Sequence, residues 1–251
     1  MEPFASLSGE ILSRLARFGR VCVLDTVNST NDYAFSLVDR KEPVVVVARR
    51  QTKGRGRFRR RWFSDHDSLV FSVLLFPKIG ALVVGGLTQI VGLALCRAIE
   101  IETGLKPVLR WPNDVLHGEK KLAGILCEAR RGAVVVGVGI NLNQSEFPTN
   151  LPSPGSLYQA LGRRADGLAL LETFLEQLYE LVSRVEKSGA GSLLPEVKDR
   201  SAVLNKRVEV RTMFKRQVGT VIDLDADGRI VLRIDSGRLV VLSAGQVRQL
   251  R

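Results

Sequence analysis

The sequence predicts an α+β protein in two parts: a core of mixed β-sheet with flanking helices over residues 1–200, and a small β-barrel over residues 201–251. Apolar residues recur at helical and at strand spacing up to residue 199, whereas short alternating strands separated by turns follow from Ser201. The chain of 251 residues is long enough to bury a sizeable core. We therefore expect two folded units of unequal size.

The first part begins with helix and strand patterns in alternation. Helical spacing predicts a helix within residues 1–20, and a short strand follows at Val21–Leu24. Residues 28–31 read Asn-Ser-Thr-Asn, which are N-cap types, so we expect a helix from there to about Asp39. Apolar runs then predict strands at Val44–Ala48 and Leu69–Phe76, and an apolar helix over residues 81–103 that ends at Gly104.

The remaining patterns complete the sheet and add the barrel. Strands are predicted at Val108–Arg110, Leu122–Glu128 and Ala133–Leu142, the last two joined by a turn at residues 130–132. Residues 143–155 hold three prolines and indicate a loop, before helices at Gly167–Lys187 and Ser192–Asp199. The barrel strands are expected at residues 208–210, 218–222, 230–234 and 239–242.

Positive charge is concentrated in two places. The chain has 37 Lys and Arg against 26 Asp and Glu, so a polyanion is the first partner to consider. Residues 49–61 hold eight cations and no acid, and residues 201–251 hold ten cations and five acids. The basic segment lies between two predicted strands and is anchored at both ends, which is more typical of a lid over a site than of a nucleic-acid-binding tail.

Several protein classes are disfavoured by the remaining residue types. The three cysteines are too scattered for a disulfide framework, and with the two histidines they fit no usual zinc spacing. The N-terminus lacks the layout of a signal peptide, so we expect a cytoplasmic protein. The apolar stretch at residues 79–96 barely reaches the length of a membrane span and has no basic flank, which favours a buried helix.

The basic loop contains Gly54-Arg55-Gly56-Arg57, an alternation of glycine and arginine. Glycine lets backbone amides approach an anion closely, and a guanidinium group clamps it. The pattern therefore suits a phosphate or a carboxylate. On these four residues alone, nonspecific binding of nucleic acid is an equal alternative.

A second group of candidates surrounds Trp111-Pro112. Pro112 fixes a turn after a strand, and Asn113 and Asp114 then offer oxygen ligands of the kind that Mg²⁺ prefers. Lys121 follows, in a position to face a developing negative charge, with Gly124 leaving room nearby. Ordinary turn residues and a surface lysine are the alternative interpretation.

Glycines and tryptophans supply the last candidates. Gly137 and Gly139 alternate along a strand, so either a ligand lies against bare backbone there or the apolar helix packs closely. Trp62 or Trp111 could stack on a ligand ring, although a large aromatic residue beside a turn more often belongs to the core.

Four motifs, in this order and spacing, resemble those of biotin protein ligases: GRGRFRRRW at 54–62, RWPND at 110–114, KLAGIL at 121–126 and GVGINLN at 137–143. The Asn-Ser-Thr at 28–30, Gln51 and the small barrel fit the same family. The resemblance implies a fold like that of class II synthetases with an SH3-like barrel, in the short form that lacks an N-terminal DNA-binding domain. Arg59 replaces a usual glycine and Arg110 a usual lysine, which bears on loop closing and on one cationic contact.

The resemblance also implies a reaction. Biotin and ATP, with Mg²⁺, give biotinyl-5′-AMP and pyrophosphate, and a lysine of a carboxylase's biotin carboxyl-carrier domain then takes the biotinyl group. A carboxylate meets a triphosphate in the first step, so clustered cations are required. No specific DNA or membrane partner is implied, and both a monomer and a homodimer are open.

The roles that the resemblance implies for single residues fall into three sets. The catalytic set is Arg55, Arg57, Asp114 and Lys121, with Asp114 also the candidate Mg²⁺ ligand. The biotin-binding set is Ser29, Thr30, Asn31, Gln51, Arg55, Gly56, Arg57, Lys121 and Gly124. The ATP-binding set is Arg57, Trp62, Arg110, Asn113, Lys121 and Asn141. The alternatives are a nucleic-acid-binding protein that uses the basic loop and barrel, and a relative that acts on lipoate.

Overall fold

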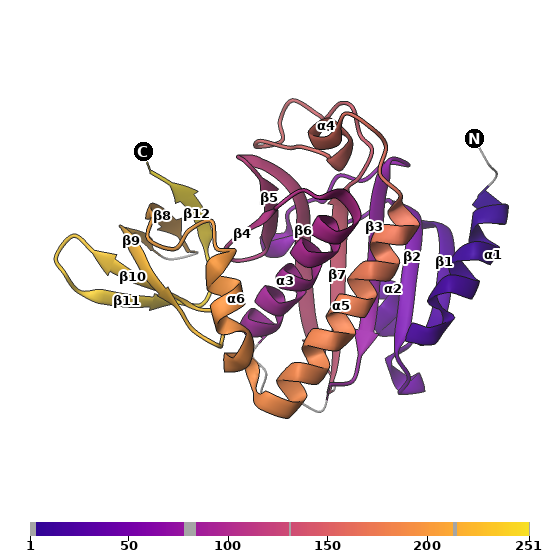
Figure 1. Cartoon of the computed structure of the whole chain (residues 1–251), viewed down its shortest axis with the longest axis horizontal. Coiled ribbons are helices and arrows are strands. Elements are labelled where there is room, and N and C mark those ends of the chain that lie inside the picture. Colours follow the sequence, from indigo (N-terminus) through magenta and orange to yellow (C-terminus); the bar gives the residue numbers. More distant parts are fainter. Residues whose placement is uncertain (1–3, 78–83, 131, 213–214, 251) are drawn as a thin grey trace.

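Two β-sheets form the framework of the protein (Figure 1). The computed structural model describes residues 4–77, 84–130, 132–212 and 215–250, without the side chains of residues 4–8, 59 and 84. One sheet has seven strands in the order β1-β2-β3-β7-β6-β5-β4, and the other has five in the order β11-β10-β9-β8-β12. β1 pairs with β2 in parallel, whereas the β2–β3, β3–β7 and β6–β7 pairs are antiparallel. The larger sheet is therefore mixed, as predicted.

The elements follow the predicted order. The seven-stranded sheet and its helices comprise α1 (Phe4–Leu15), β1 (Arg20–Val27), α2 (Thr30–Ser36), β2 (Val44–Gln51), β3 (Ser68–Leu75), α3 (Val84–Thr103), β4 (Val108–Arg110), β5 (Asp114–His117), β6 (Lys120–Arg130), β7 (Ala133–Asn141), α4 (Leu157–Leu161), α5 (Gly167–Ser188) and α6 (Leu194–Asp199). The five-stranded sheet comprises β8 (Arg207–Arg211), β9 (Arg216–Leu224), β10 (Ile230–Ile234), β11 (Leu239–Leu242) and β12 (Gln246–Gln249).

Some boundaries differ from the prediction. The short elements β5, α4 and β12 were not predicted. Asp114 consequently lies in a strand instead of a turn, and α2 ends at Ser36 instead of Asp39. Residues 1–3 and 81–83 of the predicted helices, and residue 131 of the predicted turn, lie outside the described residues.

Alternate residues of the central strands enter two different cores, because successive side chains of a strand point to opposite faces. Val45 and Val47 of β2 pack beneath α1, α3 and α5, whereas Val44 and Val46 face α2. Helices α3 and α5 lie together over the first face, which we call the helical face (Figure 1). Residues 84–96 of the apolar stretch belong to this covering layer, and residues 79–83 lie outside the described residues. Within the described ranges, no helix is long and apolar enough to cross a membrane.

The opposite face, which we call the α2 face, is covered differently. Helix α2 packs on β2, β3 and β7. Five positions of β3, β6 and β7 that alternate with the helical-face core are small or polar; they are Ser72 of β3, Gly124 and Glu128 of β6, and Gly137 and Gly139 of β7. This side of the sheet therefore has room for the loop that follows β2.

The two sheets meet through tight contacts at Trp111. Its indole is 2% exposed, packs in the core of the five-stranded sheet and donates a hydrogen bond to Gly228 O at 2.7 Å. A Cβ atom at Gly86 would come 2.5 Å from Ala226 O, so the start of α3 needs glycine to lie against this turn. Trp111 therefore belongs to the core of the five-stranded sheet, the alternative that its position beside a turn suggested.

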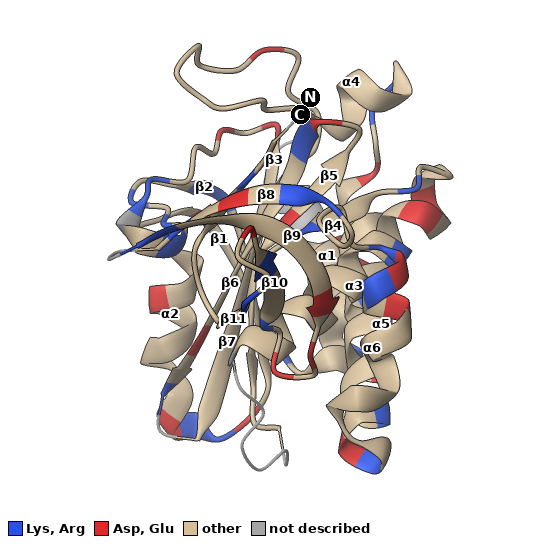
Figure 2. Ribbon diagram, turned by 90° about the vertical axis from the view of Figure 1, so that its left-hand side faces the viewer, with Lys and Arg blue, Asp and Glu red and all other residues tan. Residues whose placement is uncertain are grey.

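Charges on the outer helices are largely paired. Figure 2 shows Lys and Arg interleaved with Asp and Glu along α5 and α6. Arg184 lies 2.7 Å from Glu196, and Arg97 lies 3.2 Å from Glu180. These pairs join neighbouring helices, so their charges serve the fold.

Candidate functional site

The start of α2 places three polar residues on the α2 face. Ser29 is the N-cap and accepts a hydrogen bond from Asp32 N at 3.4 Å, which confirms the predicted cap. Thr30 and Asn31 follow, and both side chains are almost fully buried. Capping by Ser29 thus fixes the start of α2, so that the side chains of Thr30 and Asn31 point toward the sheet.

A continuous chain of polar side chains crosses this part of the sheet; we call Gln51, Thr30, Ser72, Asn31 and Glu128 the polar chain. Thr30 N donates to Gln51 Oε1 at 2.8 Å, and Thr30 Oγ1 lies 3.1 Å from the same oxygen. Ser72 Oγ lies 2.7 Å from both Thr30 Oγ1 and Asn31 Oδ1. Asn31 Nδ2 donates to Glu128 Oε2 at 2.8 Å and to Leu126 O at 3.2 Å.

The polar chain is short of protons. Asn31 uses its amide group to donate to Leu126 and Glu128, so its oxygen faces Ser72 as an acceptor. Three oxygen–oxygen contacts remain: Gln51–Thr30, Thr30–Ser72 and Ser72–Asn31. Only the two hydroxyl groups, those of Thr30 and Ser72, have protons to donate in these three contacts. At least one oxygen at this site therefore has capacity for a donor from outside, such as a ligand N–H group.

The glycines on this face make room for protein side chains. A Cβ atom at Gly137 would come 2.1 Å from Asn31 Oδ1, and one at Gly139 would come 2.4 Å from the indole of Trp62. Gly124, the partner of Gly139 in the β6–β7 register, would clash with the same indole at 2.9 Å. The suggested close packing of the apolar helix is wrong, because α3 lies on the other face. In this structure Trp62 covers the bare backbone, and its buried Nε1 has no hydrogen-bond partner among the described residues.

Cationic groups surround one carboxylate beside Trp62; we call Arg57, Arg110 and Lys121 the cation cluster. Lys121 Nζ lies 2.5 Å from Asp114 Oδ1, and Arg110 Nη2 donates to Asp114 Oδ2 at 2.7 Å. Burial lowers the pKa of the Arg57 guanidinium, while the negative charge of Asp114 acts in the opposite direction. Lys121 Nζ is also 5.4 Å from the Trp62 ring centre. Three cations against one acid leave a positive site that suits an anion.

Two asparagines predicted to bind ATP hold backbone here. Asn141 Nδ2 donates to Lys121 O at 3.0 Å and to Gly155 O at 2.8 Å. Asn113 Nδ2 donates to Ile125 O at 2.8 Å. Together with Lys121 N, which donates to Ser153 O at 2.9 Å, these bonds fix the start of β6 and hence the base of the Lys121 side chain.

The basic loop is folded as a small hairpin over residues 54–62. Gly56 N donates to Arg60 O at 2.7 Å, and Trp62 N donates to Gly54 O at 2.9 Å. Arg55 projects toward α2, where its Nη2 lies 2.5 Å from Asp32 Oδ1 and 3.9 Å from Glu128 Oε2. The two arginines of the glycine–arginine alternation therefore have different neighbours. The side chain of Arg59, at the predicted hinge, lies outside the described part of the chain.

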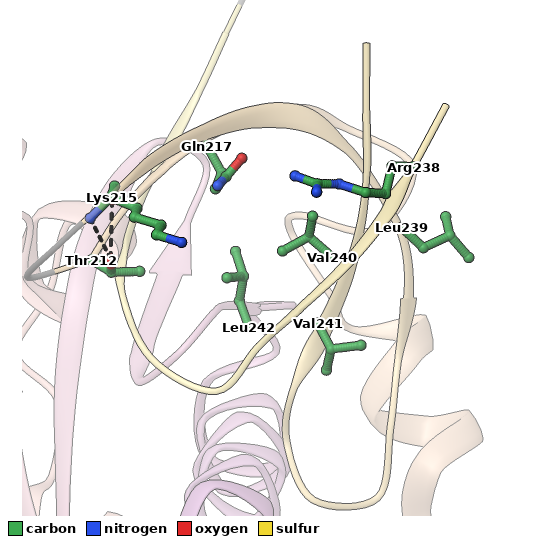
Figure 3. Close-up of a pocket in the computed structure, with 8 residues that line it drawn as sticks. All are labelled: Thr212, Lys215, Gln217, Arg238, Leu239, Val240, Val241 and Leu242. Atoms are coloured by element: carbon green, nitrogen blue, oxygen red, sulfur yellow. Dashed lines mark hydrogen bonds between the residues drawn. The ribbon is translucent and has the colours of Figure 1, made fainter. Parts of the chain in front are cut away.

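A hollow of about 450 Å³ lies elsewhere, on the five-stranded sheet (Figure 3). Its lining residues are Thr212, Lys215, Gln217, Arg238, Leu239, Val240, Val241 and Leu242. None of the residues predicted for the site is among them, and the lining includes no carboxylate. We therefore place the candidate site on the α2 face, where the polar chain and the cation cluster meet Trp62.

The sequence analysis missed Ser72, Asp32 and Glu128. Ser72 is the single polar residue between Leu69 and Leu75, and this isolated position is the signal that a polar contact lies on that face. Glu128 alternates with Gly124 along β6 and therefore shares its face. Their partners lie 41 and 97 residues away in the chain, so their pairing could not be predicted.

Comparisons with known proteins agree with this geometry. Residues 23–145 match the model of the biotin/lipoate A/B protein ligase family, and residues 203–247 match the biotin protein ligase C-terminal domain. The chain is 33% identical to the biotin–[acetyl-CoA-carboxylase] ligase of Mycobacterium tuberculosis, over 83% of this chain and 79% of that protein. It is 29% identical to the bifunctional ligase/repressor BirA of Bacillus subtilis, over 88% of this chain and 71% of that protein.

A solved structure shares the whole architecture. The biotin protein ligase of Aquifex aeolicus in complex with biotin and ATP superposes with a TM-score of 0.82 at 28% identity. The match covers 92% of this chain and 99% of that one, and so includes both sheets.

Proposed function

The chain belongs to the biotin protein ligase family, and on that premise we propose that it converts biotin and ATP to biotinyl-5′-AMP and pyrophosphate and then biotinylates a carrier protein. The acceptor is a lysine of a carboxylase's biotin carboxyl-carrier domain. The observation that carries the proposal is the adjacency, on one face of the sheet, of the donor-poor polar chain and the cation cluster. The polar chain suits the ring end of biotin, and the cation cluster suits its carboxylate end.

The polar chain suits the ring end of biotin. The ureido group offers two N–H donors and one carbonyl acceptor, and the oxygens of Thr30, Ser72 and Asn31 are short of protons. We assign Ser29, Thr30, Asn31, Gln51 and the backbone of Gly56 to this end. A lipoyl ring has no N–H group, so it gains nothing from such oxygens.

The cation cluster suits the reacting end. The biotin carboxylate oxygen attacks the α-phosphorus of ATP, the bond to the bridging oxygen breaks, and pyrophosphate leaves with that electron pair. Two anions meet in this step, so Lys121 and Arg57 lower the barrier by offsetting their repulsion and the charge of the transition state. Asp114 holds Lys121 in position and Arg110 supports Asp114. Gly124, which has no side chain, lets the Trp62 indole and the Lys121 side chain lie against β6. Trp62, Asn113 and Asn141 remain our candidates for the nucleotide end.

The second step needs no protein nucleophile. The amine of the acceptor lysine attacks the biotinyl carbonyl carbon, the anhydride bond to AMP breaks, and the amine loses a proton. Water would destroy the mixed anhydride before transfer, so the hairpin of the basic loop must cover it. Trp62 at the end of that hairpin is the group that touches the floor of the site.

In this structure Asp114 is engaged by two cations and offers no free oxygen to Mg²⁺. Both carboxylate oxygens of Asp114 already face a cation, and no group of three or more His, Cys, Asp or Glu side chains within the described ranges could hold a metal. We assign no step to the metal.

Incubation with biotin, ATP, Mg²⁺ and a biotin carboxyl-carrier domain tests the proposal. We expect biotin-dependent release of pyrophosphate and a gain of one biotinyl group on the acceptor lysine, measured by intact mass. Absence of both would contradict the proposal, and a gain with lipoate but not with biotin would favour the lipoate-specific relative.

Sedimentation with and without biotin plus ATP distinguishes a monomer from a homodimer. We also propose that the division between the two parts lies at about residues 200 and 201, between α6 and β8.

A further inference from the structure

Arg55 makes contacts that the reaction does not require. It lies in the basic loop, but its guanidinium group reaches Asp32 of α2 at 2.5 Å and Glu128 of β6 at 3.9 Å. An arginine that clamps a substrate anion directly would have no need of two carboxylates. These two acids instead tie the loop to elements of the sheet.

The hairpin links the contacts of Arg55 to the position of Trp62. Arg55 and Arg61 form an isolated antiparallel β-bridge across the hairpin, and Trp62 N donates to Gly54 O. Arg55 and Trp62 therefore belong to one small folded unit. A force that holds Arg55 against α2 also holds the Trp62 indole over Gly124 and Gly139.

Glu128 extends the tie to the polar chain. The same oxygen, Oε2, accepts a hydrogen bond from Asn31 Nδ2 at 2.8 Å and faces Arg55. Asn31 in turn contacts Ser72, which contacts Thr30. The position of the loop and the order of the ring-binding oxygens are thus linked through one carboxylate.

We propose that Asp32 and Glu128 are positioning residues that latch the loop through Arg55 and couple its closed position to the ring-binding end of the site. The inference rests on the proposed function for the identity of the ligand. The Arg55 and Asp32 side chains are 40% and 51% exposed, so water and salt weaken this pair. A latch of this strength holds the empty loop and can still open in each catalytic cycle.

The latch and a direct anion clamp predict opposite changes in ligand affinity. Removing both carboxylates, in the double variant D32N/E128Q, frees Arg55. If Arg55 binds the ligand anion directly, its release strengthens ligand binding. If Arg55 is a latch, its release loosens the loop and weakens binding.

The experiment measures tryptic cleavage within the loop of the unliganded chain and the Kd for biotin by calorimetry. The double variant keeps every Lys and Arg cleavage site, and the glutamine at position 128 keeps an acceptor for Asn31. We expect faster cleavage in the loop and a Kd for biotin raised about fivefold. D235N is the matched control, because the Arg207–Asp235 pair is exposed and lies on the five-stranded sheet. It should change neither value.

Unchanged cleavage together with equal or tighter biotin binding would overturn the proposal. Single variants E128Q and E128A separate the two links: E128A also removes the acceptor of Asn31, so it should raise the KM for biotin more than E128Q does. Equal KM values for the two would overturn the coupling to the polar chain. Cleavage of the unliganded loop needs no turnover, so failure of the latch is distinguishable from failure of wild-type biotin transfer.

Discussion

The two faces of the seven-stranded sheet are built from alternate residues of the same strands, yet they differ in chemistry. On the helical face, Phe71, Val73, Ile125 and Val138 form a dry core under α3 and α5. On the α2 face, residues next to these in the chain are Ser72, Gly124, Gly137 and Gly139. One face supplies stability, and the other supplies space, polar oxygens and charge. Two adjacent residues of one strand can therefore serve stability and function separately. Substitutions at such adjacent positions test this division.

The sharpest such pair is Phe71 and Ser72 on β3. Both side chains are fully buried, and the centre of the Phe71 ring lies 5.2 Å from the centre of the Phe174 ring on α5. Phe71→Ala should lower the free energy of unfolding by about 3–5 kcal/mol, because it leaves a cavity. Ser72→Ala should lower it by about 1–2 kcal/mol, because it removes a hydroxyl from a buried polar group.

Activity should show the reverse order for this pair. Ser72→Ala disturbs Thr30 and Asn31, so it should raise the KM for biotin, whereas Phe71→Ala should leave the KM of the folded fraction unchanged. Urea unfolding and steady-state pyrophosphate release provide the two measurements. Equal KM values for the two variants would contradict the division between the faces.

Lys121 provides the next largest effect, on the α2 face. Lys121→Ala should retain the fold but lose about 3 kcal/mol of transition-state stabilisation, which is on the order of a hundredfold in the rate of adenylate formation. The neighbouring residue Lys120 is exposed and provides the matched control. Lys120→Ala should keep the wild-type rate of biotin-dependent pyrophosphate release. Full activity of Lys121→Ala would show that the cation is wrongly assigned.

The two tryptophans extend the comparison to the junction of the sheets. Trp111→Phe removes the hydrogen bond to Gly228 O and should cost about 1 kcal/mol of stability. Trp62 Nε1 has no hydrogen-bond partner within the described part of the chain, so Trp62→Phe should cost less stability than Trp111→Phe while changing ligand binding. Thermal unfolding with and without biotin plus ATP measures both effects. A larger loss of stability for Trp62→Phe would contradict the assignment of these roles.

The last effect concerns the thiols of the helical face and is confined to alkaline pH. Burial raises the pKa of Cys96 and of Cys127 to about 12. An unfolded thiol ionises near pH 8.5, at about its ordinary pKa. The folded state keeps its protons between these values, so stability is unaffected below pH 8.5 and falls as the pH rises toward 12.

Urea unfolding at a series of alkaline pH values checks this direction. The double variant Cys96→Ala, Cys127→Ala should show a flatter decline than the wild type. An identical decline would show that these thiols are not responsible.

Strong local patterns made most of the fold predictable. Val44–Ala48, Leu69–Phe76 and the apolar helix ending at Gly104 combine long apolar runs with clear ends, and the structure places strands or a helix at each. The N-cap at Ser29 was equally local. The strands β5 and β12 were not predicted, because β12 has a single apolar residue, Val247, and β5 begins directly after the turn types Pro112 and Asn113.

The sequence motifs gave candidate residues for the site but not their arrangement. The motifs identified Lys121, Asp114 and Trp62, yet only the folded chain shows that Asp114 pairs with Lys121 and Arg110, or that Trp62 needs both Gly124 and Gly139. Trp111 and Trp62 look alike in sequence, and their burial against different sheets separates them. Pairings between distant strands depend on register, which no short motif encodes.

Amide hydrogen exchange, with and without biotin plus ATP, tests the central claim that the α2 face is the reacting face. We predict slower exchange in the loop over residues 51–67 and at the start of α2, with little change in α5. Slower exchange at Arg238–Leu242, beside the hollow of the five-stranded sheet, with no change in the loop would contradict the account.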